Sequence, residues 1–330
     1  RGILETNHQA KHECACGWII VLAPVDAWGK SAKRHLRVGT LVRGKRKHVV
    51  ACRIYREIVN PALVLATSCT DLDVDVKSKY TEYPTESEIA LEAKMSDVYY
   101  AFRTQLGNNY NRTQTFASDE AAGISFDGDY YDSAENVNPT LHNFNPENKP
   151  LNYWADLASG ITKCNQFIDD LAGNNSKAMQ IAQARTMRAF YHFILMDSFG
   201  DVPVLDRVPD DGEAVERKPR AEVAAFIEKE LKECLPLLSD KNNAATYGKP
   251  NRWMAEALLV KLYINWGVYT CANVADYDAT TTVNNKLDEC VAMCDDIIKS
   301  HLFNLDDTYR KKFLYNNGVH IKDLIYAMPY

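Results

Sequence analysis

Residues 181–199 read IAQARTMRAFYHFILMDSF, with Gly200 directly after them and Pro203 close behind. Apolar residues recur in this run every three or four positions, which is the spacing of one face of an α-helix. They are Ile181, Ala184, Met187, Tyr191 and Ile194. Gly200 is a typical residue for ending a helix, and Pro203 cannot continue one. The run therefore predicts a long helix that ends at Phe199.

Helical periodicity recurs on both sides of this run. The expected helices lie at about 88–106, 151–171, 176–199, 219–236, 250–267 and 285–300. In the first, Thr85 or Ser87 can cap the start. Its loose apolar stripe consists of Ile89, Ala93, Val98 and Phe102. The turn Gly173–Ser176 joins the second and third helices and contains an N-cap for the third.

The segments between these helices are polar, and signals for β-strands are few. A long polar and aromatic loop is expected from Gly107 to Pro150, and the short run Leu324–Ala327 is the one strand candidate. Each helix needs a neighbour for its apolar face. We therefore predict an all-α protein with a tetratricopeptide-like helical-repeat scaffold and long loops, with a general α-bundle as the alternative.

Side chains inside the helical patterns are interpreted as packing residues. This applies to the aromatic residues Trp154, Tyr191, Phe193, Tyr263 and Trp266, and to the cysteines Cys164, Cys234, Cys290 and Cys294. A free cysteine within a helix behaves as a small apolar residue. Arg188 and Arg252 are expected to pair with acids or to cap carbonyl groups between helices. The histidines lack the spacing of a metal site, and Asp127-Gly128-Asp129 lacks the remaining ligands of a calcium loop.

The net charge of the chain changes sign at Cys69, from basic before it to acidic after it. Residues 1–68 hold 12 Lys/Arg against 4 Asp/Glu, whereas residues 69–330 hold 26 against 40. Such an acidic body is a poor partner for nucleic acid, whose phosphates need a cationic face. Upstream of Cys69, basic residues at 43–47 precede the apolar run PALVLATS at 61–68. This order is typical of a lipoprotein signal that is cleaved before a lipidated cysteine.

These features predict three parts of the chain. Residues 1–68 are an upstream or signal segment outside the mature fold, 69–85 are a lipidated N-terminus and tether, and 86–330 are the helical domain. The alternative is that residues 1–68 are a genuine N-terminal segment and that Cys69 is a free thiol.

Seven segments, in the same order, resemble the SusD/RagB family of surface lipoproteins. They are Cys69–Asp73, Trp154–Ile168, Ala184–Phe193, Phe199–Val204, Arg220–Leu231, Gly248–Tyr263 and Lys322–Ala327. The third resembles the family signature AxxxRAxxYF, and the fourth resembles its FGxVPL turn. Pro250 and Trp253 depart from the GRxTK pattern of the sixth segment. Family members also continue beyond the last segment, so the resemblance implies a domain that is incomplete at its C-terminal end.

The resemblance implies a function. Members of this family bind glycans at the cell surface and deliver oligosaccharides to a SusC-like TonB-dependent transporter in the outer membrane. The same role is expected here, with a membrane anchor through a lipid on Cys69, no enzymatic activity and no cofactor or metal.

The expected glycan site lies in the long loop. Ser118-Asp119-Glu120 resembles the S/T-D-E segment that precedes the family's aromatic glycan contacts. A pyranose packs its apolar face on an aromatic ring, and its hydroxyl groups bond to carboxylates and amides. We expect Phe126, Tyr130 and Tyr131 to stack on sugar rings, and Asp119, Glu120 and Asp127 to bind hydroxyl groups. The alternative for each residue is that it fixes the loop to the scaffold.

Two other functions fit parts of the sequence. A glycoside hydrolase would pair Asp119 or Glu120 with Asp127 or Asp129 as acid and base. A helical-repeat scaffold would bind a protein partner and no glycan. No catalytic motif accompanies the acidic residues, which favours binding without catalysis.

Overall fold

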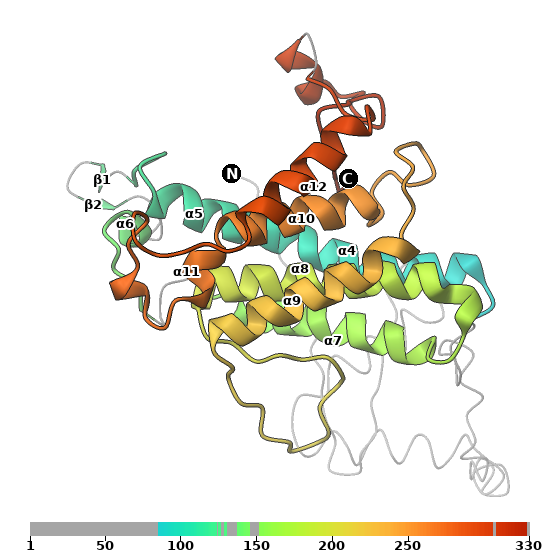
Figure 1. Cartoon of the computed structure of the whole chain (residues 1–330), viewed down its shortest axis with the longest axis horizontal. Coiled ribbons are helices and arrows are strands. Elements are labelled where there is room, and N and C mark those ends of the chain that lie inside the picture. Colours follow the sequence, from blue (N-terminus) through green and yellow to red (C-terminus); the bar gives the residue numbers. More distant parts are fainter. Residues whose placement is uncertain are drawn as a thin grey trace, which may run out of the picture. The chain divides into compact units, whose positions relative to one another are not determined.

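The computed structural model describes residues 85–123, 125–126, 129–130, 137–145, 152–305 and 308–328, all within one compact unit, Tyr80–Tyr330. Its main helices are α4 (Glu88–Thr104), α5 (Asn111–Ala117), α7 (Trp154–Asp170), α8 (Ala178–Phe199), α9 (Arg220–Cys234), α10 (Arg252–Ile264) and α12 (Leu287–Lys299). Two short helices, α6 (Val137–Thr140) and α11 (Trp266–Thr270), lie in the connections. The predicted all-α fold is confirmed, and α7, α8 and α9 lie side by side (Figure 1).

Minor elements complete the described chain. Short 3₁₀-helices span Asn175–Lys177, Leu235–Leu237, Val274–Asp276 and Tyr309–Phe313. The strands β1 (Ser125–Phe126) and β2 (Asp129–Tyr130) pair antiparallel, with Ser125 opposite Tyr130 and Phe126 opposite Asp129. No strand forms at Leu324–Ala327, so that prediction is wrong. In the described chain no other strand lies beside this run to complete its hydrogen bonds.

The ends of α8 follow from local chemistry. Asn174 accepts a hydrogen bond from the backbone of Ser176 just before the helix, and Gly173 takes the left-handed conformation with φ of 79°. At the other end Gly200 has φ of 78°, which favours glycine, and its N–H bonds to the carbonyl of Met196. The predicted turn at 173–176 and the predicted end at Phe199 are both confirmed.

The first helix differs from the prediction in two respects. Ser87 caps it as expected, but Ile89 is 82% exposed and the buried face is Leu91, Met95, Val98 and Phe102. The chain also does not enter a loop at Gly107. It continues through a π-helical segment, Gln105–Tyr110, directly into α5. The turns of a π-helix hold more residues than those of an α-helix. Contacts of α5 with distant parts of the chain, described below, hold this extension in place.

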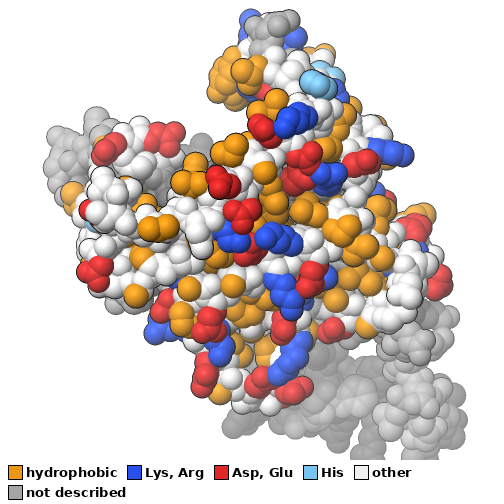
Figure 2. Space-filling view, in the orientation of Figure 1, with side chains coloured by type: hydrophobic (Ala, Val, Ile, Leu, Met, Phe, Trp, Pro, Cys, Tyr) orange, Lys and Arg blue, Asp and Glu red, His pale blue; other side chains and the backbone are white. Residues whose placement is uncertain are grey.

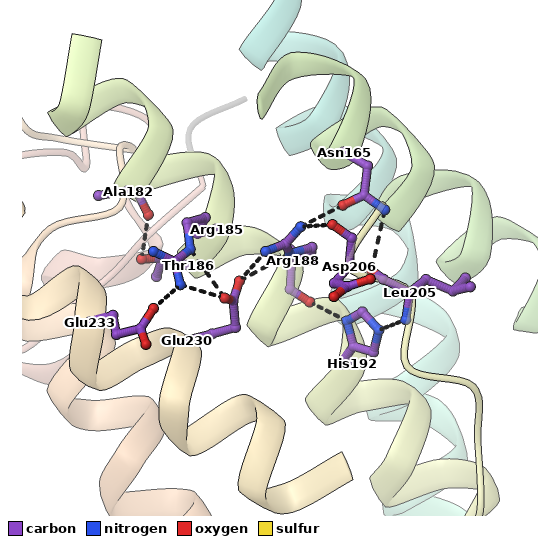
Figure 3. Close-up of polar contacts among 10 residues, drawn as sticks. All are labelled: Asn165, Ala182, Arg185, Thr186, Arg188, His192, Leu205, Asp206, Glu230 and Glu233. Carbon is purple, nitrogen blue, oxygen red and sulfur yellow. Dashed lines mark hydrogen bonds and ion pairs between the residues drawn. The ribbon is translucent and has the colours of Figure 1, made fainter. Parts of the chain in front are cut away.

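A buried polar network ties α7, α8 and α9 together (Figure 3). The Arg188 guanidinium donates to the Glu230 carboxylate at 2.5 and 3.0 Å and to Asn165 Oδ1 at 2.7 Å, and all three residues are at most 5% exposed. Arg185 donates to the second oxygen of Glu230 at 2.6 Å. The prediction that Arg188 pairs with an acid between helices is confirmed. Arg252 likewise pairs with Glu256 and Asp296.

The same network fixes the loop after α8. Arg188 also donates to the carbonyl of Asp206, and Asn165 donates to the carbonyl of Leu205. His192 Nδ1 lies 2.8 Å from the carbonyl of Arg188, and its Nε2 accepts from the N–H of Leu205 at 3.1 Å. Only the neutral ring with its proton on Nδ1 satisfies both contacts. Complete burial lowers the pKa of His192 to about 4, which agrees with a neutral ring.

The remaining helical residues pack largely as predicted. Tyr191, Phe193 and Tyr263 are buried, and Trp154 and Trp266 are partly buried against the same core. Cys164, Cys234 and Cys290 are buried free thiols, and Cys294 is half-buried. The helix expected to end at Gly267 instead breaks at Asn265 between α10 and α11. No helix in the described part of the chain combines the length and apolar character needed to cross a membrane.

Candidate functional site

Two open cavities adjoin at the C-terminal end of α5, where both are lined by Ala117. The first has a volume of about 710 Å³ and lies between α5, the end of α8 and the start of α7. The second has a volume of about 700 Å³ and lies between residues 117–122 and the end of α6. Each is large enough for a small oligosaccharide segment, since typical ligand pockets measure ~300–1,000 Å³.

Aromatic side chains form one side of the first cavity. Trp154 is the first residue of α7 and Phe199 is the last of α8, and their rings meet edge to face at 5.1 Å. Both are half-buried, so part of each ring reaches the cavity. Phe144, in the segment after α6, is 48% exposed on the same lining. These rings can pack against the apolar face of a sugar.

A fixed carboxylate and three amides supply the polar part of this cavity. Asp197 of α8 accepts hydrogen bonds from the hydroxyl groups of Tyr110 and Tyr269, both at 2.7 Å, and from Gln114 Nε2 at 3.3 Å. Burial, together with the neighbouring Asp197 charge, raises the pKa of both tyrosines. Both phenols therefore stay protonated and keep donating. The amides on the lining are Gln114, Asn145 and Asn152.

The second cavity contains two of the predicted site residues, Asp119 and Glu120. Glu120 accepts from Thr115 Oγ1 at 3.2 Å, and its own N–H donates to Ser118 Oγ at 3.3 Å. The Asp119 side chain is exposed. A tight turn at the end of α5 thus presents both carboxylates to the solvent side of the cavity.

His142 connects the two cavities. It lines the second, its Nε2 lies 2.9 Å from the carbonyl of Ala117, and its ring lies parallel to that of Phe144 at 6.1 Å between centroids. Phe144 in turn lines the first cavity. The two cavities therefore form one continuous surface, which we call the α5 site. It consists of the residues that line either cavity.

The other predicted site residues are only partly described. The backbones of Phe126 and Tyr130 lie in β1 and β2, which leaves the roles of their side chains as predictions. Asp127, Tyr131 and the lipidation residue Cys69 lie outside the described residues. The structure thus brings Asp119 and Glu120 together on the α5 site.

Sequence reasoning missed the aromatic lining. The helical spacing predicts a packing role for Trp154, and it does contact the core, but it also lines the first cavity together with Phe199 and Phe144. The sequence holds one signal for this role. Trp154 and Phe199 lie at the ends of helices that flank loops, where a side chain can face a cavity. In the described part of the chain no group of three or more His, Cys, Asp or Glu residues could hold a metal ion.

Comparison with known proteins identifies relatives of this chain. Residues 72–264 match the model of a family, SusD-like, that is described as starch-binding and associated with the outer membrane. The starch-binding protein SusD of Bacteroides thetaiotaomicron is 30% identical over 119 residues, which is 36% of this chain and 21% of SusD.

Solved structures share the fold. A laminarin-binding SusD-like protein superposes with a TM-score of 0.56 at 21% identity, covering 69% of this chain and 48% of its own. Surface glycan-binding protein A from Bacteroides uniformis gives 0.58 at 16% identity, with 73% and 52% covered. The chain therefore spans about half the length of these two structures. Because the family model matches more than half of the chain, the chain belongs to the SusD-like family, whose description is one of binding and not of catalysis.

Proposed function

We propose that this chain binds an oligosaccharide at the α5 site without cleaving it. One observation carries the proposal: exposed aromatic rings and hydrogen-bonding side chains meet on one continuous surface at the end of α5. Phe144 and Trp154 offer ring surfaces, and Asp119, Glu120 and Asp197 offer acceptors for sugar hydroxyl groups. The names of the starch-, laminarin- and glycan-binding relatives support the same ligand class.

The site residues that the structure does not describe belong to the same proposal. Phe126, Asp127, Tyr130 and Tyr131 follow Glu120 within eleven residues of the chain. Support comes from the backbone of β1 and β2, which begins five residues after Glu120. In this proposal their side chains extend the α5 site with further rings and a carboxylate.

A glycan panel tests the proposal directly. Soluble starch, laminarin, galactomannan, polygalacturonate and hyaluronan are titrated against the purified chain by calorimetry. Binding of at least one glycan is expected, and Phe144→Ala should weaken it about tenfold. The matched control is Tyr315→Ala, because Tyr315 is a fully exposed aromatic residue outside the α5 site. Equal weakening by both variants, or no binding at all, contradicts the proposal.

Two further variants test the undescribed residues. Tyr130→Ala and Tyr131→Ala should each weaken binding of the same glycan. If both bind as tightly as the parent, these two residues are not part of the site. Released reducing sugar after prolonged incubation would instead indicate a hydrolase, and affinity for a protein with none for glycans would indicate an interaction scaffold.

Membrane attachment and transport complete the proposed role. The chain is anchored to the outer membrane through a lipid on Cys69 and hands its oligosaccharide to a SusC-like TonB-dependent transporter. Support comes from the basic, apolar and small residues that precede Cys69, and from the family's description as associating with the outer membrane. Cys69→Ala should leave the fold intact and release the protein from membranes. A variant that still fractionates with membranes lacking the transporter would place the anchor elsewhere.

A further inference from the structure

The described lining of the α5 site contains acidic side chains but no lysine or arginine. Among the described residues that line its two cavities, the acidic side chains are those of Asp119, Glu120 and Asp197, and no lysine or arginine occurs. This is not a shortage of basic residues, since residues 69–330 contain 26 Lys/Arg. On the face drawn in Figure 2, basic side chains are seen over α9, α10 and α12, interspersed with acidic ones, and acidic side chains are also seen at the end where α5 and α6 lie.

The sequence that follows α5 is also rich in acidic residues. The segment from Ser118 to Pro150, which supplies the second cavity and Phe144, contains seven Asp/Glu residues and one lysine, Lys149. This count comes from the sequence alone and is independent of where any side chain lies. The described lining and the sequence that adjoins it in the chain therefore both have an excess of acidic residues.

The hydrogen-bonding capacity of the lining also favours neutral glycans over anionic ones. An ionised carboxylate only accepts hydrogen bonds, so it suits the hydroxyl groups of a neutral sugar, which donate. A uronate, sialate or sulfate group on a glycan also only accepts. Placed beside Asp119, Glu120 or Asp197, it would meet a like charge. The donors on the lining include the amides of Gln114, Asn145 and Asn152, which carry no charge to offset that repulsion. Anion-binding sites in proteins typically use arginine or lysine instead.

We infer that the α5 site selects uncharged glycans and discriminates against glycans that carry carboxylate or sulfate groups. This inference rests on the proposed function and specifies its ligand class. The discrimination comes from like-charge repulsion and from the absence of a cationic partner in the described lining. It should therefore weaken as salt screens the charges.

A matched pair of ligands tests the inference. The neutral glycan that binds best in the panel is oxidised at its C6 hydroxyl groups, which converts its sugars to uronates without changing the linkages. Both forms are titrated by calorimetry at pH 8, where histidine is uncharged, in 20 mM and 300 mM salt. The oxidised form should bind at least about tenfold more weakly at low salt, and the ratio should fall at high salt.

Charge-neutral variants link this effect to the site. Asp119→Asn combined with Glu120→Gln keeps the shape of both side chains and removes both charges. The penalty, meaning the factor by which the oxidised glycan binds more weakly than the neutral one, should shrink by about threefold or more. The matched control is Glu86→Gln combined with Asp240→Asn, two exposed acids that lie outside the α5 site, near the N-terminal ends of α4 and α10. It changes the net charge equally and should leave the penalty unchanged.

The possible failures are distinguishable. Equal or tighter binding of the oxidised form overturns the inference and leaves the proposed function standing. A panel in which only polygalacturonate or hyaluronan binds has the same two consequences. A penalty that both double variants reduce equally also overturns it, because the net charge of the protein would then be the cause. No binding to any glycan contradicts the proposed function and the inference together.

Discussion

The α7–α8–α9 core and the α5 site both contain charged side chains, but the core buries and pairs them, whereas the α5 site leaves Asp119 and Glu120 exposed. In the core, Arg188 and Glu230 are at most 5% exposed and bond to each other and to further partners on three structural elements. At the α5 site, Asp119 is exposed, and Glu120 accepts a single bond from a neighbouring threonine. Buried charges in the core hold helices together, whereas Asp119 and Glu120 at the α5 site remain accessible to a ligand. The difference shows where polar groups stabilise this fold and where they are available for binding.

Removing an acid from the core should have the largest effect. Glu230→Ala leaves Arg185 and Arg188 without their shared carboxylate, and breaking a buried ion pair typically costs about 3–5 kcal/mol. The free energy of unfolding, measured in urea, should fall by that amount. Glu222→Ala, an exposed position on the same helix, is the control and should change it by less than about 0.5 kcal/mol. Similar losses in both variants would mean that the network contributes little.

Acid should weaken the core through His192. Its pKa is lowered to about 4 by burial, whereas an unfolded histidine takes up a proton near pH 6.5. Between these values the unfolded chain binds the proton and the folded chain does not, so stability falls as the pH falls. The loss should reach about 3 kcal/mol across the window from pH 6.5 to 4.

Urea unfolding between pH 7.5 and 4.5 measures this loss. Acidic residues also titrate in part of this range, so the comparison is with His192→Gln, whose amide can donate and accept but does not ionise. The variant should show a shallower decline in stability with falling pH. Identical pH profiles for the two proteins would rule out His192 as the sensitive group.

Adding a side-chain atom at the contact between α7 and α8 should lower the free energy of unfolding by somewhat less than the changes above. A Cβ atom at Gly160 would lie 2.2 Å from ring atoms of Tyr191, and that ring is fully buried with its hydroxyl bonded to the carbonyl of Val98. Gly160→Ala should therefore destabilise the fold by about 1–3 kcal/mol in thermal or urea unfolding. Gly107→Ala meets no atom within 4 Å and should be neutral or stabilising. If Gly160→Ala is also neutral, the packing there is looser than described.

The smallest effect on stability is expected at the α5 site. Phe144→Ala should change the free energy of unfolding by less than about 0.5 kcal/mol, because the ring is half exposed. The same change should reduce glycan affinity about tenfold, as proposed above. A large loss of stability instead would mean that Phe144 fixes the fold, and the contrast between the two regions would be weaker.

The core could be predicted from the sequence because its signals are local or periodic. The end of α8 follows from Gly200, and the pairing of Arg188 follows from a charged residue within an apolar helix. The extension of α4 into α5 could not be predicted, since Gly107 and the neighbouring asparagines favour a loop. Contacts with distant residues hold it, above all the bond from Tyr110 to Asp197.

The α5 site could be predicted only in part. Asp119 and Glu120 were found because they are adjacent and resemble a family segment. Phe144, Trp154 and Phe199 were not, because they come from three separate elements that only the tertiary fold brings together. Whether a helical tryptophan faces the core or a cavity depends on what packs against it, which periodicity alone does not specify.

The π-helical segment Gln105–Tyr110 has a consequence for how such a site can change. Each residue of an α-helix turns the chain by about 100°, so losing one residue from this segment would rotate α5 by roughly that angle relative to α4. Different side chains would then replace Thr113, Gln114 and Ala117 on the cavity walls, while the Arg188–Glu230 network would be untouched. An insertion or deletion at this one point would therefore change which side chains line the first cavity, at the cost of the bonds from Tyr110 and Gln114 to Asp197.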